Sequence, residues 1–278
     1  MKGRVTLYKN FKFLISNFKF QILLLTAYCV LLTTAGYAEP QSLTIAAPAQ
    51  QGITTLSVAA ASDLSFALKE ISQQFEKESN IKVIISFGST GVLSQQIENG
   101  APFDIFFAAN EKYINTLEEK GLIIPNTKQL YAQGRLVLAV HEGFKSNIKN
   151  LKDLLQPSVK RVAIANPDHA PYGIAAKEAL RKLGLWDKLK PKLVYAENIR
   201  QAIQFIQTGD AHAGIVALSV INVPEVKYTI IDNTLHQPIN QIVAIMRTTK
   251  AEKEARKFID YVIKDGKGIM QRYGFVMP

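Results

Sequence analysis

Residues 55–91, TLSVAAASDLSFALKEISQQFEKESNIKVIISFGSTG, are the clearest guide to the fold. The segment 56–60 is a short apolar run typical of a buried strand. Apolar residues then recur at helical spacing over 64–75, and Ser62-Asp63 in front of them is expected to cap the helix. A second β-rich run, 81–87, leads into a turn that contains glycine. This order of strand, helix and strand predicts one step of a parallel sheet.

The same alternation continues towards the C-terminus. Further strands are predicted at 105–109, 136–140, 161–165, 192–195, 213–217 and 242–246. Helical patterns separate most of them, and an amphipathic pattern over 251–264 predicts a closing helix. Strands that alternate with helices of about 10–15 residues are typical of the α/β class, with mainly parallel sheets flanked by helices.

The N-terminus has the pattern of a secretory signal peptide over residues 1–38. A basic segment precedes the apolar run 22–32, and Gly36-Tyr37-Ala38 matches the small-x-small cleavage pattern. The sequence therefore predicts export to the periplasm, followed by a loose tail at 39–54. An uncleaved membrane anchor is the alternative. A lipoprotein is disfavoured because Cys29 lies inside the apolar run.

Composition excludes several classes of protein. The formal charge is +10, but residues 1–38 contain five bases and no acid, which leaves 28 Lys and Arg against 23 Asp and Glu. This small excess forms no basic stripe, so nucleic-acid binding is not expected. Cys29 is the only cysteine, which excludes disulfide scaffolds and cysteine metal sites. The four histidines show no metal-ligand spacing.

Four turns, each at the start of a predicted helix, carry the main functional signal: 60–63, 87–91, 170–173 and 197–200. In open α/β sheets, ligands bind beyond the carboxyl ends of the strands, and helix N-termini there offer unpaired N–H groups to anions. Ser62 and Ser89 are 27 positions apart, and so are Tyr172 and Ile199. Because this is about one βα step, each pair can lie at one sheet edge.

Each of these residues also has a simpler interpretation. The serines are common N-caps, Tyr172 can simply pack, and Ile199 can contribute only a backbone N–H. His169 beside Asp168 is better explained as a loop-ordering residue than as part of a catalytic pair, because no nucleophile elbow accompanies it. The combination of all four turns is what favours a ligand site.

Six short segments then point to a family: AAASDL at 59–64, FGSTG at 87–91, GAPFDIF at 100–106, NPDHAPYG at 166–173, GIV at 214–216 and QRYGF at 271–275. Together they resemble the ModA family, the molybdate-binding proteins of ABC transporters. The resemblance covers about residues 55–278 in the right order.

The resemblance implies a two-lobed periplasmic binding fold of type II, with the ligand in the cleft between the lobes. We expect residues 55–135 plus 225–278 to form the first lobe and residues 136–224 the second. The implied ligand is a tetrahedral molybdate or tungstate dianion, held by N–H and hydroxyl groups. No cofactor is implied, and no metal is coordinated directly by side chains.

The resemblance also implies the ligand contacts. Ser62 and Ser89 supply hydroxyls and amides from the first lobe. Tyr172 occupies the contact position in its Pro-x-Gly turn, and Ile199 is the backbone donor of the fourth helix. Many members have a tyrosine where Ala217 stands here, so the phenol of Tyr172 is expected to substitute for it.

Three charged residues near these turns are expected to stay off the ligand. A carboxylate would repel a dianion, so Asp63 is expected to turn away and cap its own helix. Arg200 and Lys177 are interpreted as solvated surface bases.

The sequence thus predicts a monomeric, exported solute-binding protein, not an enzyme, that captures molybdate and tungstate for an ABC transporter permease. Hinge closure is expected to bring the lobes together, with the chain crossing near Leu136 and returning near 218–224. A binding protein for another oxyanion such as sulfate, or for an organic solute, is the main alternative. A secreted enzyme and a sensory domain are the others.

Overall fold

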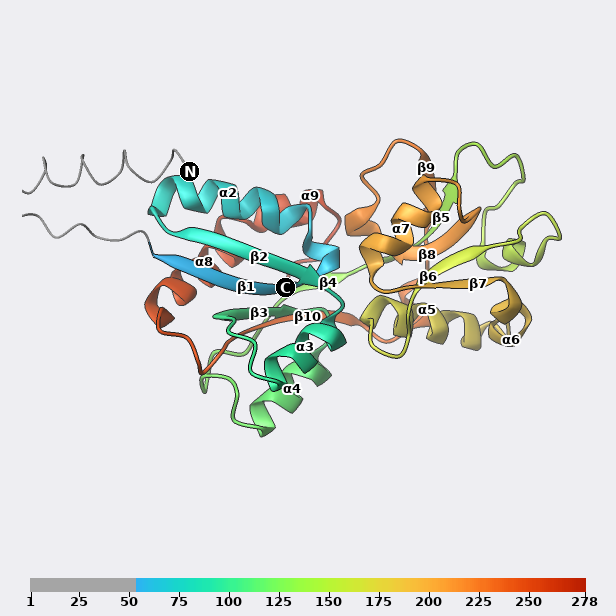
Figure 1. Ribbon diagram of the computed structural model, residues 1–278. Coiled ribbons are helices and arrows are strands. Elements are labelled where there is room, and N and C mark those ends of the chain that lie inside the picture. The colour runs from blue at the N-terminus through green and yellow to red at the C-terminus, as the bar shows by residue number, and fades with distance from the viewer. Residues whose placement is uncertain (1–53) are drawn as a thin grey trace, which may run out of the picture. The chain divides into compact units, whose positions relative to one another are not determined.

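The computed structural model describes residues 54–278, which fold into two five-stranded sheets flanked by helices (Figure 1). The predicted signal peptide and almost all of the predicted tail lie outside the described residues. Within the described part, no helix is both long and apolar enough to cross a membrane.

The first sheet has the strand order β2-β1-β3-β10-β4. Its strands are β1 (Thr55–Ala61), β2 (Lys82–Gly88), β3 (Ile105–Ala108), β4 (Gln129–Gly134) and β10 (Ile239–Ile245). Helices α2 (Ala67–Ser79), α8 (Glu252–Lys264) and α9 (Lys267–Arg272) lie on one side of it, and α3 (Thr90–Glu98) and α4 (Glu111–Glu119) on the other (Figure 1). We call this sheet with its helices the first lobe.

The second sheet has the order β7-β6-β8-β5-β9, and with its helices it forms the second lobe. Its strands are β5 (Leu136–His141), β6 (Val162–Ala165), β7 (Leu193–Ala196), β8 (Ala213–Ala217) and β9 (Val226–Ile230). The helices are α5 (Pro171–Lys182), α6 (Trp186–Leu189) and α7 (Ile199–Gln207). Short 3-10 turns are η1 (Ser62–Leu64), η2 (Leu151–Leu155), η3 (Lys190–Lys192), η4 (Leu218–Val220) and η5 (Asn233–Leu235).

The central strands are apolar because both of their faces are buried. Val58 and Phe107 pack into the core beneath α2 and α8, whereas Ala59 and Phe106 pack into the core beneath α3 and α4. Successive strand residues point to opposite faces, so a strand covered on both sides has no polar positions. This explains why the sequence contained continuous apolar runs rather than alternating ones.

The α/β prediction is confirmed, but the sheets are mixed rather than mainly parallel. In each sheet three strands run parallel, and two more are added in antiparallel pairing. The sequence analysis missed β4 and β9, which are edge strands with exposed residues such as Leu130 and Tyr228. Edge strands bury less side-chain surface, so their apolar signal is weaker.

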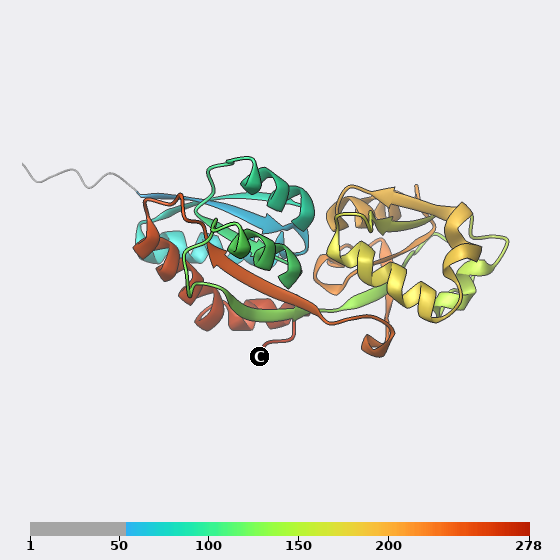
Figure 2. The same cartoon turned by 90° about the horizontal axis from the view of Figure 1, so that it is seen from below.

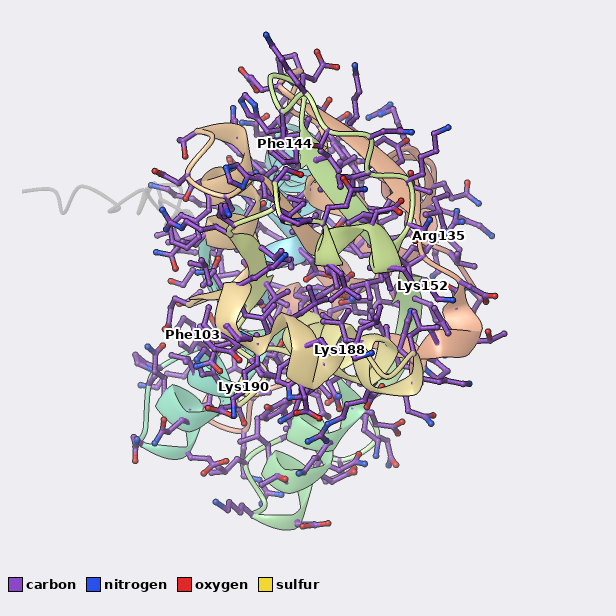
Figure 3. All side chains as sticks on the ribbon, turned by 90° about the vertical axis from the view of Figure 1, so that its right-hand side faces the viewer. Phe103, Arg135, Phe144, Lys152, Lys188 and Lys190 are labelled. Atoms are coloured by element: carbon purple, nitrogen blue, oxygen red, sulfur yellow. The ribbon has the colours of Figure 1, made fainter. Side chains whose placement is uncertain are left out.

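Two chain segments connect the lobes. Arg135, labelled in Figure 3, is the single residue between β4 and β5. The chain returns between β9 and β10, and Ile239 pairs with Gly134, so the two connections lie beside each other (Figure 2). The predicted return at 218–224, with the second lobe ending at 224, was wrong, because β9 pairs with β5 in the second sheet.

The expected cap of the first helix was also wrong. Ser62 and Asp63 lie inside the 3-10 turn η1, whose N-cap is Ala61, and α2 begins only at Ala67. No side chain caps either element. The side chains of Ser62 and Asp63 therefore do not cap this part of the chain.

Candidate functional site

The four predicted site residues line one small cavity. Its volume is about 10 Å³, and both lobes contribute to its wall. The lining residues are Ala61, Ser62, Asp63, Gly88, Ser89, Thr90, Ala109, Ala170, Pro171, Tyr172 and Ile199. They lie just beyond β1, β2 and β3 and at the starts of α5 and α7, the predicted edge of each sheet. The structure thus brings together residues that are up to 137 positions apart in the sequence.

The wall of this cavity is buried and nearly free of charge. Ser62 and Ser89 are each 4% exposed, and Tyr172 and Ile199 are 2% and 3% exposed. Asp63 is the only lining residue with a carboxyl group, and no Lys, Arg or His side chain lines the cavity. Such a wall offers hydroxyl and N–H donors without a countercharge.

Ser89 joins the two lobes. It is the N-cap residue of α3, but its side chain makes no capping bond. Instead its Oγ donates to the carbonyl oxygen of His169 at 2.7 Å, and its Oγ lies 2.8 Å from His169 Nδ1. A hydroxyl has one proton, so the proton given to His169 is not available to a ligand in this arrangement.

His169 has a larger part than the sequence indicated. Its carbonyl oxygen also accepts from the N–H of Gly91 at 3.0 Å and from Tyr113 Oη at 3.4 Å. Three donors of the first lobe therefore converge on one carbonyl of the second. A Cβ atom at Gly91 would lie 2.6 Å from that carbonyl oxygen, so this close approach requires glycine.

Tyr172 reaches across the cavity as well. Pro171 occupies the first position of α5 and has no N–H, so the backbone donors of this helix begin at Tyr172. The phenolic hydroxyl donates to Asp63 Oδ2 at 2.9 Å. It also lies against the backbone of Gly134, next to the first connection between the lobes, where any side chain would collide with it.

Asp63 lines the cavity, but its side chain does not cap its own helix as expected. It is 1% exposed, and its Oδ2 accepts from both Tyr172 and Gln241 Nε2, the latter at 2.7 Å. Among the described residues, its Oδ1 has no hydrogen-bond partner. Burial raises the pKa of the Asp63 carboxyl to about 6, although the hydrogen bonds from Tyr172 and Gln241 act in the opposite direction. No residue-type signal in the sequence distinguished this aspartate from an ordinary helix cap.

Ile199 begins α7 and lines the cavity. The side-chain oxygen of Asn198 accepts from the N–H groups of Arg200 and Gln201. This cap satisfies the second and third donors of the helix and does not engage the first, which belongs to Ile199. The Ile199 side chain itself is part of the core of the second lobe.

Three other residues named in the sequence analysis, Ala217, Arg200 and Lys177, do not line the cavity. Ala217 is fully buried in the core of the second lobe. The guanidinium of Arg200 lies 4.4 Å from the ring centre of Phe66, a residue of the first lobe, and is half-buried rather than solvated. Lys177 lies above the Trp186 ring, 5.3 Å from its centre.

The described residues give little support to other kinds of site. Among residues 54–278, no three His, Cys, Asp or Glu side chains are grouped so that they could hold a metal ion. A larger cavity of about 410 Å³ lies in the second lobe, between η2 and the segment 229–235. Its wall is mainly apolar, and none of the four predicted site residues belongs to it.

Comparison with known proteins adds an independent line of argument. The family described as bacterial extracellular solute-binding protein matches residues 56–276. The chain is 38% identical to the molybdate-binding protein ModA of Azotobacter vinelandii over 233 residues, which are 78% of this chain and 88% of that protein. It is 35% identical to ModA of Escherichia coli K12, with 80% and 89% covered.

A solved structure has the same architecture. The periplasmic molybdate-binding protein of Azotobacter vinelandii superposes with a TM-score of 0.75 at 32% identity, covering 80% of this chain and 99% of that one. The fold is therefore the two-lobed type II arrangement, as predicted.

Proposed function

Because the chain belongs to the ModA family of bacterial extracellular solute-binding proteins, we propose that it captures molybdate for uptake by an ABC transporter. The observation that carries the proposal is the cavity wall: Ser62, Ser89, Tyr172 and Ile199 converge on it from both lobes without any basic side chain. Tungstate has the same charge and shape, and we include it in the proposal.

A wall of neutral donors suits a fully ionised tetrahedral oxyanion. Such an ion accepts hydrogen bonds through every oxygen and donates none, so N–H and O–H groups match it. Helix N-termini add partial positive charge at the starts of α3, α5 and α7. We propose that the backbone N–H groups of Tyr172 and Ile199 and the hydroxyl of Ser62 face the ion directly.

Ser89 and Tyr172 contribute in a second way. In the structure their hydroxyls bond to His169 and Asp63 and so connect the two lobes. Contacts of this kind stabilise a closed arrangement, and an anion that bridges both lobes adds to the same closure. We propose that a membrane permease recognises the closed form.

The cellular setting follows from the family and the N-terminus. Members of an extracellular solute-binding family work outside the cytoplasm. We propose that residues 1–38 direct export, that the protein works in the periplasm as a monomer, and that it catalyses no reaction. The lobes are proposed to move as units made of residues 55–134 plus 239–278 and residues 136–230, according to the strand pairing.

Isothermal titration of the chain from Glu39 with molybdate, tungstate, sulfate and phosphate tests the proposal. We expect one molybdate per chain, similar affinity for tungstate, and binding of sulfate and phosphate that is weaker by at least an order of magnitude. Tighter binding of sulfate than of molybdate would contradict the proposal and favour the sulfate alternative.

A further inference from the structure

Asp63 presents a problem for any dianion in this cavity. This residue lines the cavity, is 1% exposed, and has one carboxyl oxygen without a hydrogen-bond partner among the described residues. A carboxylate beside a doubly charged anion raises the energy of both, and burial strengthens the repulsion because little solvent screens it. If the site only had to avoid negative charge near the dianion, an aspartate would not be expected at this position.

The hydrogen-bond geometry shows what the carboxyl controls. Tyr172 Oη lies 2.9 Å from Asp63 Oδ2, and Gln241 Nε2 lies 2.7 Å from the same oxygen. When the carboxyl is ionised it can only accept, so the single proton of the phenol points to Asp63. When the carboxyl is protonated it can donate to the phenolic oxygen, and the phenol is then free to donate elsewhere.

We propose that Asp63 is a positioning residue that takes up one proton as the oxyanion binds and thereby turns the Tyr172 hydroxyl from the protein to the ligand. The proton comes from solvent and forms an O–H bond on the Asp63 carboxylate, which loses its negative charge. The phenolic proton stays on Tyr172 and changes only its acceptor, from Asp63 to an oxygen of the anion. This inference rests on the proposed function.

The charged groups around Asp63 do not offer another counterion. The turn η1 packs against α2, α7, β2 and η4. The only charged residue of α7, Arg200, lies over Phe66, and η4 contains no titratable group. On β2 the only charged residue is Lys82, at the end of the strand far from the cavity.

The remaining titratable neighbours are tyrosines and the start of α2. Tyr131 of β4 reaches Gln241 at 3.4 Å, and burial keeps the pKa of Tyr131 and Tyr172 well above the ordinary value, so both stay neutral. On α2, Lys69 is exposed, and Glu70 is held by Arg272 and Tyr273. Asp63 is therefore the group that titrates in this part of the wall, and its raised pKa places the titration near neutral pH.

Proton uptake during binding is the direct test. Isothermal titration with sodium molybdate at pH 7.5, in buffers of different ionisation enthalpy, gives the number of protons taken up per anion. We expect between half and one proton for the wild-type chain. From pH 6.5 to 8 the dissociation constant is expected to rise up to about tenfold per pH unit. Molybdate stays fully ionised in this range and adds no protons of its own.

Three variants test whether Asp63, rather than another group, takes up the proton. Asp63→Asn carries an amide that donates to Tyr172 without titrating, so we expect near-zero proton uptake and tighter binding at pH 8. Tyr172→Phe is expected to bind more weakly but to keep the proton uptake. His169→Gln, which removes the imidazole next to Ser89, is also expected to keep it.

The outcomes distinguish the two proposals. No molybdate binding at any pH overturns the proposed function. Tight binding without proton uptake by the wild-type chain, or the same uptake in Asp63→Asn as in the wild type, overturns the role of Asp63 alone. The wild-type proton count and pH profile need no variant, so the proposal stays testable if Asp63→Asn does not fold.

Discussion

The two sheets share one pattern of parallel and antiparallel pairing, yet their edges offer different chemistry to the cavity. In each, three strands pair in parallel, and one strand of opposite direction separates them from an edge strand; the site is formed at the helix starts after the first two of the three in sequence. The first lobe supplies side-chain groups, namely Ser62, Asp63 and Ser89. The second lobe supplies mainly backbone: Pro171 and Ile199 begin its helices, and its one hydroxyl, on Tyr172, bonds back to the first lobe.

This difference shows that the two lobes can contribute different kinds of donor to one anion site. Backbone N–H groups at helix starts need only the correct helix position, so their side chains can serve the core. Hydroxyls can be re-aimed, so they can bond to the opposite lobe or to a ligand. Side-chain substitutions should therefore affect binding strongly at the hydroxyl residues and weakly at Ile199, which is proposed to act through its backbone.

The largest expected effect concerns Asp63 and stability rather than binding. Its folded pKa of about 6 lies above the ordinary value of 3.8, so the unfolded chain ionises first as the pH rises. The free energy of unfolding is thus expected to fall by about 2.4 kcal/mol between pH 4 and pH 7 relative to Asp63→Asn, which does not titrate. Urea denaturation of both proteins without ligand, at each pH, measures this difference.

A pH-independent gap between the two proteins would show that Asp63 has an ordinary pKa in the folded chain. In that case no titrating group of the first lobe would distinguish its side of the cavity from the second lobe. Tyr131→Phe, which removes a buried hydroxyl of the same network, serves as the control.

Next come the two serines of the first lobe. Ser62→Ala is expected to weaken molybdate binding by about 1.5–3 kcal/mol, as for a hydrogen bond to a charged group. Ser89→Ala is expected to weaken it by about 0.5–1.5 kcal/mol, because the neutral hydrogen bond to the His169 carbonyl that joins the lobes is lost. Titration calorimetry gives the affinities. Ser94→Ala is the matched control, because Ser94 is equally buried on α3 but has no hydrogen-bond partner among the described residues. Equal affinities for Ser89→Ala and Ser94→Ala would remove Ser89 from the site.

Gly91→Ala tests the contact between the lobes. A methyl group there meets the His169 carbonyl, so binding is expected to weaken by about 1–2 kcal/mol through poorer closure. The unfolding free energy of the unliganded chain should change by less than about 0.5 kcal/mol, as at an ordinary surface position. Gly268→Ala, where a methyl group meets open space, is the control. A loss of stability equal to the loss of affinity would mean that the contact belongs to the fold and not to closure.

The smallest effect on binding is expected for Ile199→Val in the second lobe. The backbone N–H is unchanged, so the affinity should stay within about twofold, whereas the lost methylene should cost about 0.5–1.5 kcal/mol of stability. Ile203→Val in the same helix should behave alike, because both side chains lie in the same core. Calorimetry and thermal denaturation together check both variants. A large loss of affinity in Ile199→Val alone would show that its side chain shapes the cavity.

The sequence by itself determined the α/β class, the helix starts that surround the cavity, and the four residues gathered there. It could do so because strand burial, helical periodicity and the spacing of about one βα step are local properties of the chain. It also determined the family, through short segments that keep their order along residues 55–278.

Only the tertiary structure decided the partners of those residues. Asp63 meets Tyr172 and Gln241 across 109 and 178 positions, and Ser89 meets His169 across 80, so no local pattern records these pairs. The same holds for β9, which joins the second sheet by pairing with β5 and moves the return of the chain beyond Ile230. Hydrogen-bond direction and the titration of a buried carboxyl depend on which groups lie opposite, and the folding of distant segments sets that.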